Sequence, residues 1–195
     1  MKKIILPVCL VALSTLAAKA QSFSVGVRGG INFSSISESG GSGGSYGTRT
    51  GFLLGGYTSI MFSSKMGIQP ELFYSSAGAT ASDPTVGAIT YKVDYISLPV
   101  FFRYNFNDMF HVLAGPQFSI LASSKATAQG TTIDWQDYTS SSDVSAVLGL
   151  GGDFGPFNAG LRYCAGLTNV EKNSGGATAT NSVIQIVAGY KFLGK

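Results

Sequence analysis

Histidine, cysteine and paired acidic side chains carry most protein catalysis and transition-metal binding, and this sequence offers few of them. Its 195 residues include a single histidine, His111, and two cysteines, Cys9 and Cys164. His111 follows closely after the turn-forming segment that contains Asp108. A zinc site or a redox disulfide needs more partners than these residues supply, and a single histidine beside a short turn is poorly placed for a Ser-His-acid hydrolase. We therefore expect no enzyme activity, no metal and no cofactor.

The more informative charges are Arg28, Glu71 and Arg162, each about five residues from a predicted tight turn or chain end. On a β-strand each of them lies on the face opposite its apolar neighbours. A carboxylate between guanidinium groups accepts bidentate hydrogen bonds, so we expect an ionic network that fills a narrow lumen. Further residues expected to join this network are Arg103, Gln117 and Asp153. The alternative is that the same side chains line a narrow conducting path.

Most of the chain alternates apolar with mixed residues at a period of two, which predicts strands with one apolar face. Only 12% of the residues are charged, against about 25% in a typical soluble domain, so the apolar face is expected to contact lipid. The alternating segments lie at 23–33, 52–62, 68–75, 96–104, 110–120, 143–154, 157–167 and 183–192.

The connections between these segments alternate in length. Short turns are expected at 63–65, 105–108 and 155–156. Long polar joins are expected at 34–50, 76–90, 124–142 and 169–181. This alternation predicts an all-β fold: a transmembrane antiparallel up-and-down β-barrel of about eight strands, with short periplasmic turns and long extracellular loops. The alternative is a soluble β-sandwich, whose strands alternate equally well.

The N-terminal segment has the layout of an export signal. Lys2 and Lys3 precede an apolar stretch, and small residues at 18–20 form a cleavage site before Gln21. We expect residues 1–20 to be a signal peptide and residues 21–195 to be one barrel domain. Without its signal the chain has 10 basic and 10 acidic residues, because three of the 13 basic residues are removed. A neutral chain gives no reason to expect nucleic-acid binding. Cys9 suggests a lipoprotein signal as an alternative, but it precedes most of the apolar stretch.

The predicted loop at 131–138 contains the only tryptophan, Trp135, together with Tyr138. Exposed aromatic side chains on a loop can anchor a partner, so these two residues are a possible interaction site. The alternative is that Trp135 packs on the rim of the barrel.

Several short segments resemble the PorT-like porin family of outer-membrane β-barrel proteins. The matching segments are Gly51-Phe52, Gln69-Pro70-Glu71-Leu72-Phe73-Tyr74, Ile96-Ser97-Leu98-Pro99-Val100 and Gly189-Tyr190-Lys191-Phe192. The resemblance covers essentially the whole mature chain and implies a barrel in the outer membrane. It also implies a possible link to protein secretion, which some members of that family serve.

These observations predict a monomeric protein of the Gram-negative outer membrane with a structural or surface-interaction role. Its expected partners are outer-membrane lipid, the assembly machinery that reads the C-terminal strand, and an unidentified surface or secretion partner. A small porin of limited permeability is the main alternative. A lipid-modifying enzyme is the less favoured one, since a histidine near the short turns is remote from outer-leaflet lipid.

Overall fold

The computed structural model describes residues 22–39, 46–83, 87–169 and 178–194, so the predicted signal peptide lies outside the described residues. Within these ranges the chain contains one 3-10 turn, η1 (Gln136–Tyr138), and no helix that is long and apolar enough to cross a membrane. Its strands are β1 (Ser22–Ser39), β2 (Tyr46–Met61), β3 (Met66–Asp83), β4 (Gly87–Asn105), β5 (Phe110–Ala128), β6 (Thr131–Asp134), β7 (Ser142–Phe154), β8 (Phe157–Gly166) and β9 (Thr178–Gly194).

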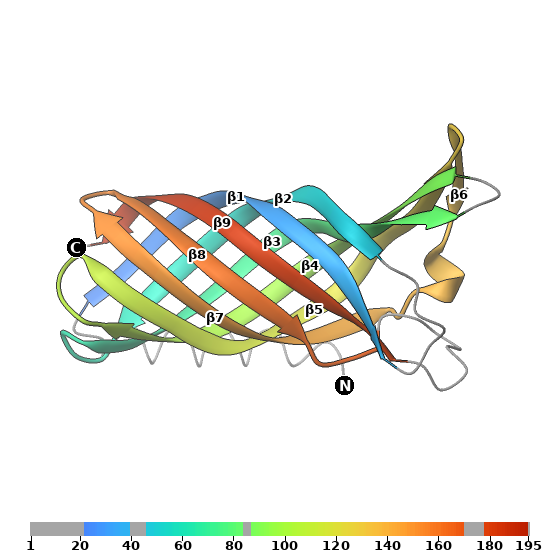
Figure 1. Ribbon diagram of the computed structural model, residues 1–195. Coiled ribbons are helices and arrows are strands. Elements are labelled where there is room, and N and C mark those ends of the chain that lie inside the picture. Colours follow the sequence, from blue (N-terminus) through green and yellow to red (C-terminus); the bar gives the residue numbers. More distant parts are fainter. Residues whose placement is uncertain (1–21, 40–45, 84–86, 170–177, 195) are drawn as a thin grey trace, which may run out of the picture.

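Eight of the strands close into an antiparallel ring in the order β1-β2-β3-β4-β5-β7-β8-β9 (Figure 1). The pairing of β1 with β9 joins the two ends of the chain, and that of β4 with β5 completes the circle. The short strand β6 lies outside the ring and pairs with the last residues of β5. A closed ring leaves no unpaired edge, which a sheet in lipid requires. The predicted eight-stranded up-and-down barrel is confirmed.

Tight turns gather at one end of the barrel, here called the turn end, where the C-terminus also lies (Figure 1). Their polar residues cap the backbone: Ser63 Oγ accepts from the Met66 N–H at 3.0 Å, and Asn107 Oδ1 accepts from the Phe110 N–H at 2.8 Å. Gly155 has a positive φ of 64° in the third turn, a conformation that glycine adopts without strain. The turns therefore follow from the residue types that predicted them.

The opposite end, here called the hairpin end, differs from the expectation of long loops. Strands β3, β4 and β5 have 18, 19 and 19 residues, whereas about 9–11 residues cross a bilayer. The segments expected as joins at 76–90 and 124–142 are mostly strand, and β6 adds a further hairpin to β5. The threonines and isoleucines of their strand portions, such as Thr80, Ile89 and Thr127, favour strand. The β3–β4 and β5–β6 connections are therefore extended hairpins that project beyond the ring (Figure 1), whereas the join expected at 169–181 lies largely outside the described residues.

The two faces of the ring separate as the alternation predicted. Outward leucines such as Leu54, Leu148 and Leu161 are more than half exposed, as expected of side chains that contact lipid. Ile60 belongs to the outward series yet has 0% exposure, and it pairs with Phe23 on β1 and Ile68 on β3.

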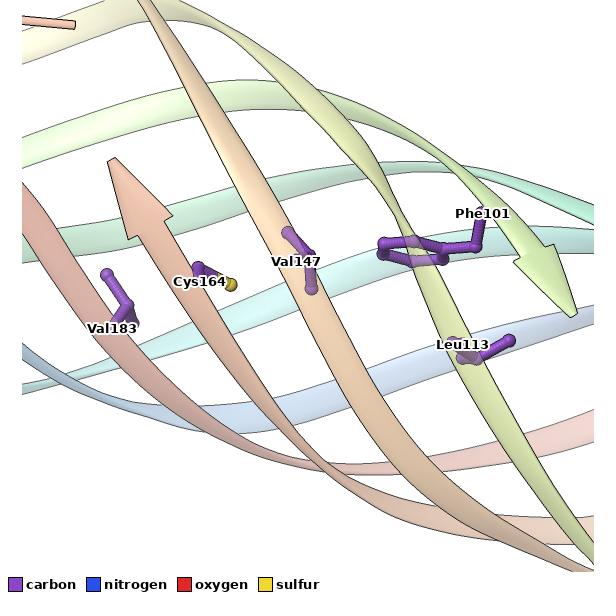
Figure 2. Close-up of a cluster of buried hydrophobic side chains, with 5 residues drawn as sticks. All are labelled: Phe101, Leu113, Val147, Cys164 and Val183. Atoms are coloured by element: carbon purple, nitrogen blue, oxygen red, sulfur yellow. The ribbon is translucent and has the colours of Figure 1, made fainter. Parts of the chain in front are cut away.

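The barrel interior contains a cluster of buried apolar side chains, shown in Figure 2. Its members are Phe101, Leu113, Val147, Cys164 and Val183. A second buried cluster joins Leu53, Phe73 and Val187. The remaining interior positions are largely polar, and they form the candidate site.

Candidate functional site

Glu71 on β3 is the centre of a buried ionic cluster inside the ring. Both terminal guanidinium nitrogens of Arg162, on β8, donate to the Glu71 carboxylate, at 2.8 Å to Oε2 and 2.8 Å to Oε1. Arg28 on β1 forms an ion pair with Oε1 from the other side. The three residues are only 2–5% exposed. Three strands that are distant in the sequence thus meet at one carboxylate, and the fork geometry of arginine suits this bidentate contact.

Two amide side chains connect this cluster to its surroundings. Neither was predicted from the sequence to be part of the ionic network. Gln69 donates to Glu71 Oε1 at 2.7 Å and accepts from Arg103 at 3.0 Å. Asn158 accepts from Arg28 at 2.7 Å and donates to the Tyr57 hydroxyl at 2.7 Å. Both amides lie on the inward face of their strands, Gln69 two residues before Glu71. The alternation of residues along each strand already places both amides on the inward face, and this could have identified them.

Arg103 belongs to the same network but does not contact Glu71 directly. It forms an ion pair with Asp153 and donates to Asn105 at 2.9 Å. His111 Nδ1 lies 3.1 Å from Asp153 Oδ2, so the histidine is bound to the same carboxylate. Gln117, which was also expected to join, instead bonds Ser119 at 3.4 Å nearer the hairpin end.

We call this set the lumen network, and it spans the barrel from wall to wall. Its residues come from seven of the eight ring strands. They are Arg28, Tyr57, Gln69, Glu71, Arg103, His111, Asp153, Asn158 and Arg162. An eight-stranded barrel is just wide enough for its side chains to fill the interior. The network therefore fills the lumen at this level.

The lumen network holds three arginines against two carboxylates, and aromatic rings cover the excess positive charge. The Arg28 guanidinium carbon lies 4.4 Å from the centroid of the Tyr57 ring. That of Arg162 lies 4.9 Å from the centroid of the Phe101 ring, which belongs to the apolar cluster of Figure 2. Cations over aromatic faces are attracted by the ring quadrupole. The apolar cluster thus forms a second filled layer directly beside the ionic one.

His111 and Cys164 are buried and packed against neighbouring groups of the barrel. His111 is 3% exposed, and a Cβ added to Gly151 would lie 2.4 Å from its Nε2, so this nitrogen rests against the neighbouring strand. Its other nitrogen is bound to Asp153. Cys164 is buried in the apolar cluster at 2% exposure. Among the described residues, no group of three or more His, Cys, Asp or Glu side chains is placed to hold a metal ion.

The lumen nearer the hairpin end is lined mainly by small polar side chains, together with the buried carboxyl group of Asp143. Ser97 and Ser119 hydroxyls lie 2.9 Å apart, and Ser34 donates to the Gly78 carbonyl at 2.8 Å. Asp143 is buried there and accepts from Thr168 at 2.5 Å and from Ser145 at 3.3 Å.

Trp135 and Tyr138, the residues expected at a possible interaction site, lie together at the hairpin end. Their rings stack with centroids 4.6 Å apart, and Trp135 also contacts Tyr91 of β4 edge-on at 5.9 Å. The backbone N–H of Trp135 donates to the Ser124 carbonyl at 2.9 Å, which anchors the turn to β5. Tyr138 is 55% exposed. We call Tyr91, Trp135 and Tyr138 the aromatic tip: Trp135 packs on the sheet, and Tyr138 faces outward.

A closed antiparallel ring with an apolar outer face and a polar, filled interior defines a transmembrane β-barrel. Residues 19–172 match the family described as outer membrane protein beta-barrel domain. The chain belongs to this family and is an outer-membrane protein. No curated protein is significantly similar to it in sequence.

Solved structures with a similar fold include OprG from Pseudomonas aeruginosa, at 16% identity and a TM-score of 0.56. That match covers 89% of this chain and 97% of OprG. Neisserial surface protein A is similar at 13% identity and a TM-score of 0.56, with 88% of this chain and 99% of the other covered. At these identities the similarity concerns the fold alone.

Proposed function

We propose that this barrel is a non-conducting surface protein, which acts through the hairpins that project from the membrane rather than through its lumen. The observation that carries the proposal is the lumen network, whose buried side chains bridge the ring. The strands of the hairpin end continue well beyond bilayer length and carry the aromatic tip. A filled interior beneath a long outer extension supports a role in contact with other molecules.

A planar-bilayer recording tests the closed lumen. The unmodified protein is expected to show no stable conductance steps, because the ionic and apolar layers together fill the interior. Steady, large single-channel conductance would favour the small-porin alternative. A Glu71→Ala variant that remains folded gives the matched measurement, since conductance that appears only in this variant identifies the lumen network as the barrier.

The surface role requires the hairpin end to face the cell exterior, which impermeant maleimide labelling tests on intact cells. Ser82→Cys, in an exposed position of β3, is expected to react. Ser64→Cys, exposed in a tight turn, is the matched control and is expected to react only after the outer membrane is opened. Native Cys164 is buried and gives the background. Reversed labelling would contradict the orientation.

The aromatic tip is the contact site in this proposal. Tyr138→Ala should leave the barrel folded while it abolishes contact with a surface partner, and Tyr163→Ala is the matched change on the lipid face of β8. A cross-linker placed at Ser141 and applied to whole cells should recover that partner with the unmodified protein and not with Tyr138→Ala. Equal recovery from both would remove the tip from the proposal. A partner within the secretion apparatus would agree with the family resemblance.

Within the barrel family we propose a PorT-like member, exported by a signal peptide that is cleaved after Ala20. Support comes from the segments 69–74 and 96–100, the first of which supplies Gln69 and Glu71 to the lumen network. N-terminal sequencing of protein from outer membranes is expected to start at Gln21. Comparison of secreted proteins between wild-type and deletion strains tests the secretion role, which an unchanged profile would exclude.

A further inference from the structure

The outer face of the ring carries a small group of charges just beyond its lipid-facing side chains. Lys92 on β4 pairs directly with Lys125 on β5, and Gly78 on β3 pairs with Lys92 from the other side. Directly opposite residues in an antiparallel sheet project to the same face. Lys92 shares its strand parity with Ile96, which is 52% exposed on the lipid face. The two lysines therefore point outward, side by side.

Arg49 of β2 reaches the same patch. Its Nη1 donates to the Ala77 carbonyl at 2.7 Å and to Ser76 Oγ at 3.3 Å. Its Cδ lies 3.3 Å from where a Cβ on Gly78 would stand, so the absence of a side chain there leaves room for the arginine. Arg49 is thus held in place next to Lys92.

One carboxylate lies among these cations. Asp94 Oδ2 is 3.2 Å from Lys92 Nζ, and Asp94 also attracts Arg49 electrostatically. Three cations against one carboxylate leave a net charge of +2 on the patch. Two lysines opposite each other on adjacent strands repel, which destabilises the sheet unless an anion lies between them. Among the described charged side chains of the eight ring strands, those with outward parity are Lys92, Asp94 and Lys125, and Arg49 reaches them although its partner Ser34 on β1 faces the lumen.

The height of the patch matches a lipid headgroup. Ile96 and Ile120, paired on β4 and β5, are the outward apolar side chains of these strands nearest the hairpin end. Lys92 lies four residues farther along β4, roughly 13 Å at about 3.3 Å per residue, or roughly 10 Å of height at a strand tilt of about 40°. Headgroups occupy roughly 5–8 Å beyond the hydrocarbon. Lysine side chains that bend toward the bilayer therefore end at headgroup level.

We propose that Arg49, Lys92 and Lys125 bind the phosphate of a phosphorylated lipid in the outer leaflet, with its acyl chains along Ile96 and Ile120. Charge complementarity selects the headgroup, and the adjacent apolar surface selects a lipid over a free anion. Guanidinium and ammonium groups together are suited to this, because arginine supplies a fixed fork and lysine a mobile point charge.

The test is a titration of the purified, folded protein in neutral detergent micelles, followed by native mass spectrometry. Monophosphoryl lipid A is the probe, and the same lipid after enzymatic removal of its phosphate is the matched ligand. Lys92→Gln/Lys125→Gln is the test variant. Lys65→Gln/Lys191→Gln removes the same charge near the turn end. The shift in electrophoretic mobility between heated and unheated samples verifies folding for each variant.

The phosphorylated lipid is expected to bind, and each lysine removed should weaken binding by about fivefold. Lys92→Arg/Lys125→Arg should retain binding, and so should the turn-end control. Inorganic phosphate at millimolar concentration should not compete, whereas raised salt should weaken binding. Equal binding of the phosphate-free lipid, or undiminished binding by the double glutamine variant, would overturn the proposal. If the double variant does not fold, Lys125→Gln alone decides, because that side chain is exposed.

Discussion

The two halves of the lumen are filled in different ways. Toward the turn end, polar and charged side chains from seven strands form one network around Glu71 and Asp153. Toward the hairpin end, serines and amides bond mainly to near neighbours, as in the Ser97–Ser119 pair. There the buried Oε1 atom of Gln117 has no hydrogen-bond partner from the protein. In the first half the ions are paired within the protein, with Arg28 Nε left unbonded, whereas in the second half we expect water to supply the missing partner of Gln117.

This difference shows where a small barrel can be closed. Burying charge is costly unless each ion is paired and hydrogen-bonded, and the lumen network meets that condition. Once formed, the network couples strands that are not adjacent in the ring. Among the described residues the hairpin-end lumen has no ion pair across the ring, although Asp143 bonds Asn181 on β9, so we expect this half to act as an antechamber to the closed layer.

The largest expected effect comes from Glu71→Ala in the lumen network. The change strands Arg28 and Arg162 without their carboxylate, which should lower the free energy of unfolding by about 3–5 kcal/mol. Urea unfolding in lipid vesicles, followed by circular dichroism, measures it. A loss of unfolding free energy below about 1 kcal/mol would mean that water screens the charges of the turn-end half as well. The two halves would then not differ in their hydration.

Exchange of a carboxylate for its amide compares the two halves with the same chemistry. Glu71→Gln removes charge-assisted bonds to two arginines and should cost about 1.5–3 kcal/mol. Asp143→Asn at the hairpin end should cost about 0.5–1.5 kcal/mol, because its contacts to Thr168 and Ser145 are with hydroxyl groups. The same unfolding assay measures both. Equal losses would show that charge pairing does not distinguish the halves.

Packing around His111 tests how tightly the turn-end lumen is filled. In Gly151→Ala the new methyl group would lie 2.4 Å from His111 Nε2, so a loss of about 1–3 kcal/mol is expected. Gly29→Ala is the matched control, since its Cβ would meet only ordinary contacts at 3.7 Å. Addition of His111→Ala should relieve the strain of Gly151→Ala. If it does not, the histidine is not part of the tight packing.

The residue pattern in the sequence predicts much of this arrangement. Parity placed Arg28, Glu71 and Arg162 on inward faces, and their similar distance from the tight turns put them at one height. Parity alone does not specify which side chains touch across the ring, because that depends on strand tilt and stagger. Arg103 therefore reaches Glu71 only through Gln69, and Gln117 lies too near the hairpin end. Strand length was underestimated for a different reason: polar Thr- and Ser-rich segments favour strand as well as loop.

The smallest expected effect concerns Ser97 and Ser119, whose hydroxyls bond each other at 2.9 Å at the hairpin end. In a double-mutant cycle with Ser97→Ala and Ser119→Ala, water that enters this half can replace either hydroxyl. The coupling free energy should therefore stay below about 1 kcal/mol. The corresponding cycle of Glu71→Ala with Arg162→Ala should give a several-fold larger coupling, because this bidentate ion pair is buried at 2–3% exposure. Unfolding free energies of the seven proteins in these two cycles, which share the wild type, give both values. Coupling between the serines as strong as that between the ions would show that both halves are dry, and the antechamber would have to be abandoned.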